Sequence, residues 1–343
     1  MPATASWTTE IIYGSDYNDP QSSAPFDGVV FPLRDAPSAS GGARFTVPAS
    51  GFEFLGVAAG ASFWLAPEFD YGYAWPGFNT DQPTGSIASY TTSDPRKSSE
   101  GSQAWIKINL VEVVYFGEGA NPQVSLWQTT GPGEAVVWAA TSDGLDSSDA
   151  FYQLAQGHSH LNWGFTEKGV YRLGMQASAY TGEDMTDPTQ SGVDGVFFAV
   201  GSYAIWKAEY FSGDDLVNEA VTGAAADPDA DGVPLMLEYA FNLLPDAPDV
   251  SYVESETGVS GLPSMSLNND NQLQIEYVRR KESTSPDISY EAQFGSGLDA
   301  EDWEAATEEV ATSIDAEWER VVVTDSVTEA SRRFGRVMVT LEP

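Results

Sequence analysis

The chain has 343 residues, and its 51 acidic side chains against 15 basic ones give a formal net charge of −36 at pH 7. This charge excludes most nucleic-acid and anionic-membrane roles, because the chain repels phosphate groups. Hydrophobic residues make up 42% of it, enough for the cores of two or three domains. It contains no cysteine, so disulfides and thiolate metal sites are excluded. No apolar run approaches the roughly 18 residues of a membrane-spanning helix.

From Trp7 to Ala204, short runs of β-branched and aromatic residues are separated by Gly, Pro, Ser and Asp. Such runs predict short strands, and the near absence of helical periodicity favours an antiparallel β-sandwich over residues 7–205. The clearest predicted strands span residues 52–55, 105–110, 135–138 and 196–200.

A second region, residues 206–250, is predicted to be an acidic linker. It has no basic residue after Lys207, and Leu235–Leu244 has the spacing and composition of one short helix, which Pro245 ends. Predicted strands return in residues 273–278, 290–294, 321–323 and 334–339. The fold class is therefore predicted as mainly β, with an N-terminal antiparallel β-sandwich, a linker with a short helix, and a smaller C-terminal β-sandwich over residues 251–343.

The linker contains a calcium-loop pattern, D-x-D-x-D-G followed by five residues and Glu. Ca²⁺ takes about six to eight oxygen ligands, alternate Asp side chains supply them, and Gly permits the sharp turn. An acidic cap on the following helix is the alternative, although a cap needs fewer carboxylates. The predicted calcium ligands are Asp227, Asp229, Asp231, the carbonyl group of Val233, and Glu238.

The loop resembles those of thrombospondin type 3 repeats and dockerins. It is more similar to a C-terminal module of secreted bacterial proteins, in which an aromatic stretch like 206–211 precedes the motifs Ala-Asp-Pro-Asp-x-Asp-Gly and Leu-Glu-Tyr-Ala, here at 226–232 and 237–240. The resemblance covers roughly the last third of the chain and implies a secreted or cell-surface protein. The first residues, 1–7, lack the features of an export signal and are typical of a mature chain with an added Met.

His158 and His160 are the only histidines of the chain. On a strand they would share one face with Asn162, while Leu161, Trp163 and Phe165 share the other. The pair predicts either a site for zinc or copper, completed by a third ligand, or a hydrogen-bonded pair that orders a loop. The candidate third ligands are Glu53, Glu68, Asp70, Asp143 and Asp149.

The histidines also lie in a longer similarity. The stretch from His158 to Tyr171 resembles the signature of the actinobacterial surface-anchored protein domain, also called the choice-of-anchor M domain. Similar motifs occur at 54–60, 64–67, 75–78, 136–138 and 198–201, so the resemblance covers about residues 50–201. It implies ligand capture at the cell envelope, but the chain lacks the family's sortase motif and transporter-binding domain.

No catalytic residues are predicted, because the histidines lie together and no Gly-x-Ser-x-Gly motif or phosphate-binding loop is present. We expect an extracellular or cell-surface binding protein whose partners are metal ions, and envelope glycan or another surface protein. A polysaccharide-binding accessory protein or glycan-active enzyme is one alternative, and a structural or adhesive layer protein is another. For the glycan alternative, the candidate surface is the aromatic cluster of Trp64, Phe69, Tyr71, Tyr73, Trp75 and Phe78.

Overall fold

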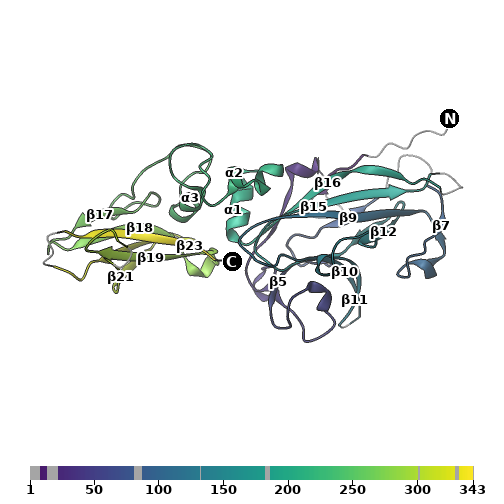
Figure 1. Ribbon diagram of the computed structural model, residues 1–343, viewed down its shortest axis with the longest axis horizontal. Coiled ribbons are helices and arrows are strands. Elements are labelled where there is room, and N and C mark those ends of the chain that lie inside the picture. Colours follow the sequence, from purple (N-terminus) through teal and green to yellow (C-terminus); the bar gives the residue numbers. More distant parts are fainter. Residues whose placement is uncertain are drawn as a thin grey trace. The chain divides into compact units, whose positions relative to one another are not determined.

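The computed structural model describes residues 8–13, 22–80, 87–131, 133–181, 186–299, 302–328 and 332–342. The predicted domain start at Trp7 lies outside these ranges. The chain forms two compact units, the first comprising residues 1–208 and 212–217, and the second residues 209–211 and 218–343. Both are built mainly of strands, coloured purple to teal in the first unit and green to yellow in the second (Figure 1). The predicted mainly β fold class is confirmed.

Two five-stranded sheets form the body of the first unit. One has the order β11-β10-β14-β5-β4, from β4 (Arg44–Thr46), β5 (Ser62–Ala66), β10 (Val124–Gly131), β11 (Glu134–Ala140) and β14 (Asn162–Phe165). The other has the order β12-β9-β15-β16-β3, from β3 (Val30–Leu33), β9 (Trp105–Phe116), β12 (Ala150–Leu154), β15 (Gly169–Ala179) and β16 (Thr189–Val200). Described neighbours are antiparallel, except that β3 runs parallel to β16.

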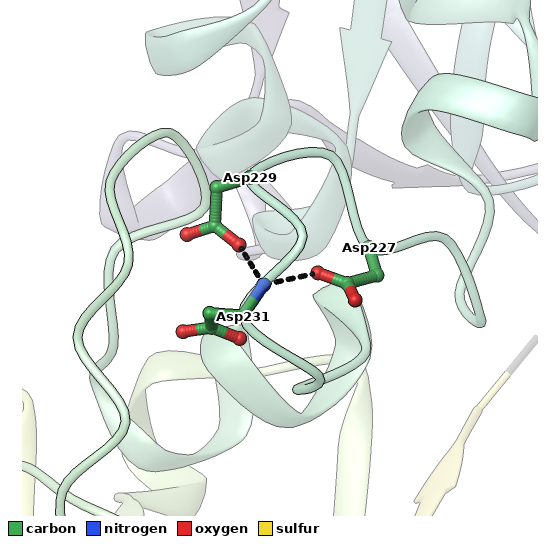
Figure 2. Close-up of side chains that lie close together, drawn as sticks. All are labelled: Asp227, Asp229 and Asp231. Atoms are coloured by element: carbon green, nitrogen blue, oxygen red, sulfur yellow. Dashed lines mark hydrogen bonds between the residues drawn. The ribbon is translucent and has the colours of Figure 1, made fainter.

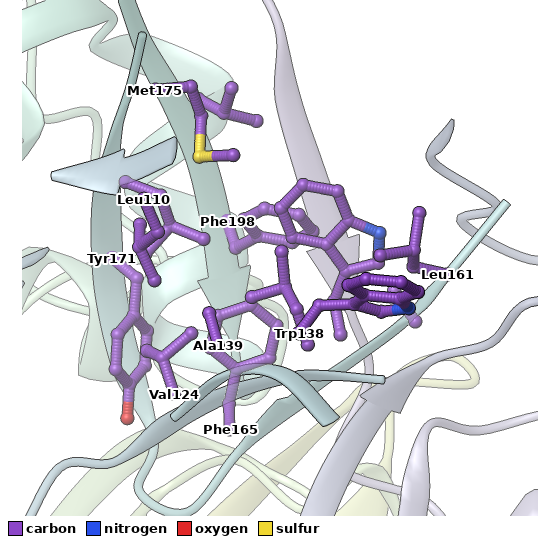
Figure 3. Close-up of a cluster of buried hydrophobic side chains, with 14 of the residues drawn as sticks. Leu110, Val124, Trp138, Ala139, Leu161, Phe165, Tyr171, Met175 and Phe198 are labelled. Carbon is purple, nitrogen blue, oxygen red and sulfur yellow. The ribbon is translucent and has the colours of Figure 1, made fainter. Parts of the chain in front are cut away.

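The two sheets share one hydrophobic core. Alternate residues of β9, Ile106, Ile108 and Leu110, pack with Phe165 of β14 and Phe198 of β16. Figure 3 shows part of this cluster, where labelled side chains from both sheets meet. Because strand side chains alternate between faces, the intervening residues of β9 lie on the opposite surface.

Three short pairs of strands complete the described part of the first unit: β1 (Ile11–Tyr13) with β2 (Ser22–Ala24), β6 (Gly77–Asn79) with β13 (His158–His160), and β7 (Tyr90–Thr91) with β8 (Ser102–Gln103). The predicted strand at 52–55 is wrong, since Glu53–Leu55 form a 3₁₀ turn. The turn ends at Gly56 in the left-handed region, φ 72°, and Glu53 accepts a hydrogen bond from the amide of Gly51. Local turn chemistry therefore overrides the apolar pattern.

The second unit contains a four-stranded and a three-stranded sheet. The first has the order β17-β18-β22-β21, from β17 (Ser264–Leu267), β18 (Leu273–Arg280), β21 (Glu309–Ser313) and β22 (Trp318–Thr324). The second has the order β20-β19-β23, from β19 (Ile288–Gly295), β20 (Trp303–Ala305) and β23 (Phe334–Leu341). Ile275 and Tyr277 of β18 are buried with Val321 and Val323 of β22, which confirms the predicted strands there.

The described helices follow β16 along the chain. They are α1 (Ser202–Tyr210), α2 (Glu219–Thr222) and α3 (Leu235–Phe241), and α3 confirms the predicted short helix. None of them is both long and apolar enough to cross a membrane. The sequence placed residues 206–250 in a linker. Residues 218–250 of this region belong instead to the second unit, because α3 packs against the strands of that unit. The Tyr239 hydroxyl donates to the Pro286 carbonyl at 2.8 Å, and the Tyr290 hydroxyl of β19 donates to the Ala240 carbonyl at 2.7 Å.

Candidate functional site

The predicted calcium loop folds back on itself between α2 and α3. Ala230 and Gly232 both have positive φ, 62° and 92°, and Gly232 stands at the position where the pattern requires a sharp turn. The loop brings together the carboxylates of Asp227, Asp229 and Asp231. Within the described ranges, these form the single group of three or more candidate ligand side chains whose ligand atoms lie within 4.8 Å of one another.

Hydrogen bonds to backbone amides orient these carboxylates. The amide of Asp231 donates to Asp227 Oδ1 and to Asp229 Oδ1, both at 3.1 Å (Figure 2). The amide of Gly232 donates to Asp227 Oδ2 at 3.0 Å, and the amide of Val233 donates to Asp231 Oδ1 at 2.8 Å. Val233 is thereby held against the loop, and its role as a carbonyl ligand stays a prediction.

Glu238 contributes a fully buried carboxylate from the first turn of α3. Its side chain has no exposed surface, and neither of its carboxylate oxygens has a hydrogen-bond partner. Burial, followed by repulsion from Asp229, Asp231, Asp249 and Asp227, raises the pKa of Glu238 to about 8. The predicted site residue is therefore near enough to the three loop carboxylates for them to disfavour its negative charge, although it lies outside the group whose ligand atoms are within 4.8 Å of one another.

Asp249 is a further acidic residue of this site that the sequence pattern did not reveal. Its backbone amide donates to Asp231 Oδ2 at 3.1 Å, and its own Oδ2 accepts from the amide of Leu244. Its Oδ1 is buried without a partner, and burial raises the pKa of its carboxyl group. The pattern ends at Glu238, so the one signal for Asp249 was an acidic residue soon after the helix.

The cluster has the donor set that a hard cation requires. Within this cluster, four buried carboxylate oxygens lack hydrogen-bond partners: Asp229 Oδ2, Asp249 Oδ1 and both oxygens of Glu238. Burial and the neighbouring carboxylates also raise the pKa of Asp229. The sequence has no Lys or Arg between 208 and 278 that could neutralise the cluster locally. Ca²⁺ takes carboxylate and carbonyl oxygens in flexible geometry, so the residues present fit this ion.

The histidine pair lies on β13, at its pairing with β6. The Nε2 atoms of His158 and His160 are 2.7 Å apart, which is a hydrogen-bond distance. The Nδ1 atom of His160 lies 3.2 Å from the Pro76 carbonyl oxygen. Because a carbonyl only accepts, Nδ1 of a neutral His160 carries the proton, and Nε2 then accepts from Nε2–H of His158. The hydrogen-bonded arrangement is therefore chemically consistent without a metal.

Trp75 covers one face of the His160 ring. Its ring stacks on the His160 ring with the centroids 3.8 Å apart and the planes 11° apart, and its Nε1 donates to the Glu68 carbonyl. Burial lowers the pKa of His160, and the nearby His158 acts in the same direction. The neutral form of His160 is thus favoured, which suits both the hydrogen bond and metal ligation.

None of the predicted third ligands completes a metal site with the two histidines. Glu68 accepts from the amide of Thr129, Glu53 from that of Gly51, and Asp149 from those of Ala140 and Asp146. Asp143 lies in a 3₁₀ turn, and Asp70 is near enough to influence the pKa of His160. Within the described ranges, none of them forms a group with the two histidines whose ligand atoms lie within 4.8 Å.

The continuous strand expected from 158 to 165 is interrupted at Leu161. The chain leaves the pair β13–β6 and enters β14 of the first sheet, where Trp163 and Phe165 join the core. Asn162 is also buried: its Oδ1 accepts from the amide of Glu68, and its Nδ2 donates to Thr129 Oγ1. The Asn162 amide is thus occupied away from the histidines.

The aromatic cluster predicted as a glycan surface is divided between the core and the surface. Trp64 is buried and donates to Asp35, and Phe78 packs against Phe151 and Trp163. Tyr71 is 63% exposed and stacks on Tyr73. A shared aromatic platform is therefore not formed by the whole cluster.

A scan against models of known protein families found no match for this chain, and none was found among curated proteins. The resemblances described from the sequence motifs consequently stay predictions.

Proposed function

We propose that this chain is a calcium-stabilised, extracellular or cell-surface binding protein. Its calcium ion is held by Asp227, Asp229, Asp231 and Glu238, with Asp249 beside them. The observation that carries the proposal is the buried Glu238 carboxylate, whose two oxygens have no hydrogen-bond partner and whose charge is disfavoured by the neighbouring carboxylates. Burying such a group without a counter-charge is unfavourable, and a divalent cation removes that penalty.

Helix capping does not account for this arrangement. A capping carboxylate accepts hydrogen bonds from the free amides at a helix N-terminus. The N-cap position of α3 is Pro234, which makes no side-chain capping bond, and Glu238 accepts no hydrogen bond. The carboxylates converge on one another rather than on the helix terminus, which favours an ion over a cap.

The calcium ion would order the second unit through α3. Glu238 precedes Tyr239, whose carbonyl accepts from Arg280 Nε at 3.0 Å and whose ring lies under the Arg280 guanidinium at 3.9 Å. Arg280 belongs to β18, so Glu238 is one residue from a contact with the sheet. Neutralising the carboxylate cluster would therefore stabilise the helix, the loop and the sheet together.

The extracellular setting is proposed from the resemblance of residues 226–232 and 237–240 to the C-terminal module of secreted bacterial proteins. The acidic surface that the chain presents, at a net charge of −36, also keeps it soluble and repels other anionic surfaces. Binding is proposed as the role of the chain because its most specific sequence pattern is an ion-binding loop.

Calorimetric melting of the whole protein in calcium and in chelator tests the proposal. Calcium should raise the free energy of unfolding of the second unit, by about 2.7 kcal/mol when the free calcium concentration is about 100-fold above the Kd. Asp229→Asn should weaken this response, whereas Asp246→Asn, which changes an exposed acid outside the cluster, should leave it intact. Identical melting of the wild type in calcium and in chelator would refute calcium stabilisation.

A further inference from the structure

The first unit carries a groove of about 930 Å³ on one face of the sheet β12-β9-β15-β16-β3. This volume lies within the range of about 300–1,000 Å³ that is typical of ligand sites. The groove is independent of the calcium loop and of the histidine pair, since none of their residues lines it.

The floor of the groove is a row of polar side chains across four strands. In β9, Ile106 and Ile108 enter the core, so Lys107 and Asn109 face the other way, into the groove. The register continues this row: Lys107 lies opposite Tyr152 of β12 and Ser178 of β15, and Ser178 lies opposite Gln190 of β16. Asn109 and Gln176 form the neighbouring row. The floor thus offers amide, hydroxyl and amino groups at regular strand spacing.

Tyrosine rings provide the apolar part of the groove. Tyr90 and Tyr180 meet edge to face, with centroids 5.0 Å apart. Burial, with Tyr152 and Tyr180 nearby, raises the pKa of Tyr90 to about 12. Tyr90 is therefore a neutral phenol at physiological pH, and its hydroxyl group can both donate and accept a hydrogen bond. Flat aromatic surfaces beside hydrogen-bonding groups suit a ligand with both apolar faces and hydroxyl edges.

The charge of the groove differs from that of the whole chain. Among the described residues that line it, Lys107 and Asp146 alone are charged, so their charges cancel, whereas the chain carries −36. Lys107 Nζ donates a hydrogen bond to the Ser147 carbonyl at 2.6 Å, so one of the three N–H groups of its ammonium is already used. Asn109 Nδ2 donates to the same carbonyl at 3.4 Å. An anionic ligand would meet one lysine against a strongly negative protein, which disfavours it.

We propose that this groove binds an uncharged polysaccharide chain. Sugar hydroxyls would pair with Asn109, Gln176 and Gln190, and sugar C–H faces would lie on the tyrosine rings. A purely apolar ligand would cover polar groups whose hydrogen-bonding capacity Lys107, Asn109 and Gln176 use only in part within the chain, and the anionic surface disfavours acidic glycans and nucleic acids. The inference deepens the proposed binding function by naming a ligand class, and it places the glycan surface away from the aromatic cluster that the sequence suggested.

Native affinity electrophoresis with soluble neutral polysaccharides, a β-glucan, an α-mannan and a xylan, tests the inference, with alginate and pectate as acidic comparisons. We expect retardation by at least one neutral polymer. The double variant Asn109→Ala/Gln190→Ala should weaken this binding about tenfold or more, because it removes two hydrogen-bonding groups from the floor. Tyr180→Ala should also weaken it. Tyr71→Ala removes an exposed ring outside the groove and should have no effect.

Circular dichroism melting of each variant verifies that the first unit is folded. The single variant Gln190→Ala serves as a further test, because Gln190 is exposed and its substitution should disturb folding least. No retardation by any neutral polymer, retardation by acidic polymers alone, or binding that survives all groove variants would overturn the inference. The same assay in chelator separates the two proposals: groove binding that persists there, beside melting that is unaffected by calcium, would refute the calcium site and retain the groove.

Discussion

The backbone amide of Asp249 donates a hydrogen bond to Asp231 Oδ2 at 3.1 Å, although the two residues are eighteen positions apart in the sequence. This bond closes the segment after α3 onto the calcium loop. It also brings the buried Oδ1 atom of Asp249 near the cluster. The loop pattern by itself contains four carboxylates, and Asp249 adds a fifth. The candidate site therefore depends on the path of the chain beyond α3 as well as on the loop.

Asp249→Asn should reduce calcium affinity. The substitution keeps the shape of the side chain and the backbone bond to Asp231 but removes one negative charge from the cluster. Residues that support a metal site typically contribute about 10–100-fold in affinity, and we expect a loss in this range by isothermal titration with Ca²⁺. Asp246→Asn, at an exposed neighbouring position, is the matched control. Equal affinities for the wild type and Asp249→Asn would exclude Asp249 from the site.

Glu238→Gln should have opposite effects with and without calcium. In chelator at pH 7 the variant should melt at a higher temperature than the wild type, because Gln removes a carboxyl group that the folded state must keep protonated at a free-energy cost among four Asp residues. In calcium it should melt lower, because it cannot supply an anionic ligand. Calorimetry under both conditions measures the reversal. Destabilisation under both conditions would mean that Glu238 has a structural role unrelated to an ion.

The stability of the second unit in chelator should fall as the pH rises from about 4.5 to about 8. The pKa of Glu238 is 4.5 when unperturbed and about 8 in the folded protein. Between these values the folded state binds more protons than the unfolded state, so rising pH favours unfolding. Saturating calcium should flatten this dependence. Urea unfolding at several pH values, for the wild type and Glu238→Gln, measures it, and a pH slope in chelator that Glu238→Gln leaves unchanged would contradict the assignment.

His158 and His160 should bind Zn²⁺ weakly. Two ring nitrogens on one tetrahedral Zn²⁺ at about 2.05 Å would be about 3.3 Å apart, so the present distance of 2.7 Å must widen and a hydrogen bond must be lost. Two ligands also leave the coordination shell incomplete. Titration with Zn²⁺, for the wild type and His158→Ala, is the measurement, and tight stoichiometric binding that His158→Ala abolishes would establish a zinc site instead.

His160→Ala should change the environment of Trp75. The ring stack of these two residues holds the loop of Glu68 against β13, and its loss should alter tryptophan fluorescence while the core transition of the first unit is kept. His158→Ala removes the hydrogen bond but not the stack, so it should change the fluorescence less. Equal changes of fluorescence in both variants would contradict the conclusion that the ring stack, and not the hydrogen bond between the histidines, sets the environment of Trp75.

The sequence alone located several of the longer strands and the loop that gathers Asp227, Asp229 and Asp231, because both depend on local periodicity and spacing. The predicted strands at 105–110, 273–278 and 321–323 lie in β9, β18 and β22. The three loop Asp residues lie at alternate positions, so the convergence of their carboxylates follows from the turn itself. At 52–55 the same approach failed, because hydrogen bonds around Gly51 and Gly56 outweighed the apolar pattern.

Only the tertiary structure decided which distant residues meet. Asp249 reaches the loop, Trp75 covers His160, and Lys107 aligns with Tyr152, Ser178 and Gln190 across four strands. None of these relationships has a local pattern, since each depends on strand register and on how the chain returns after a turn. The sequence could specify the chemistry of each short segment, but the burial of Glu238 and the polar floor of the groove arise when separate segments pack and exclude water.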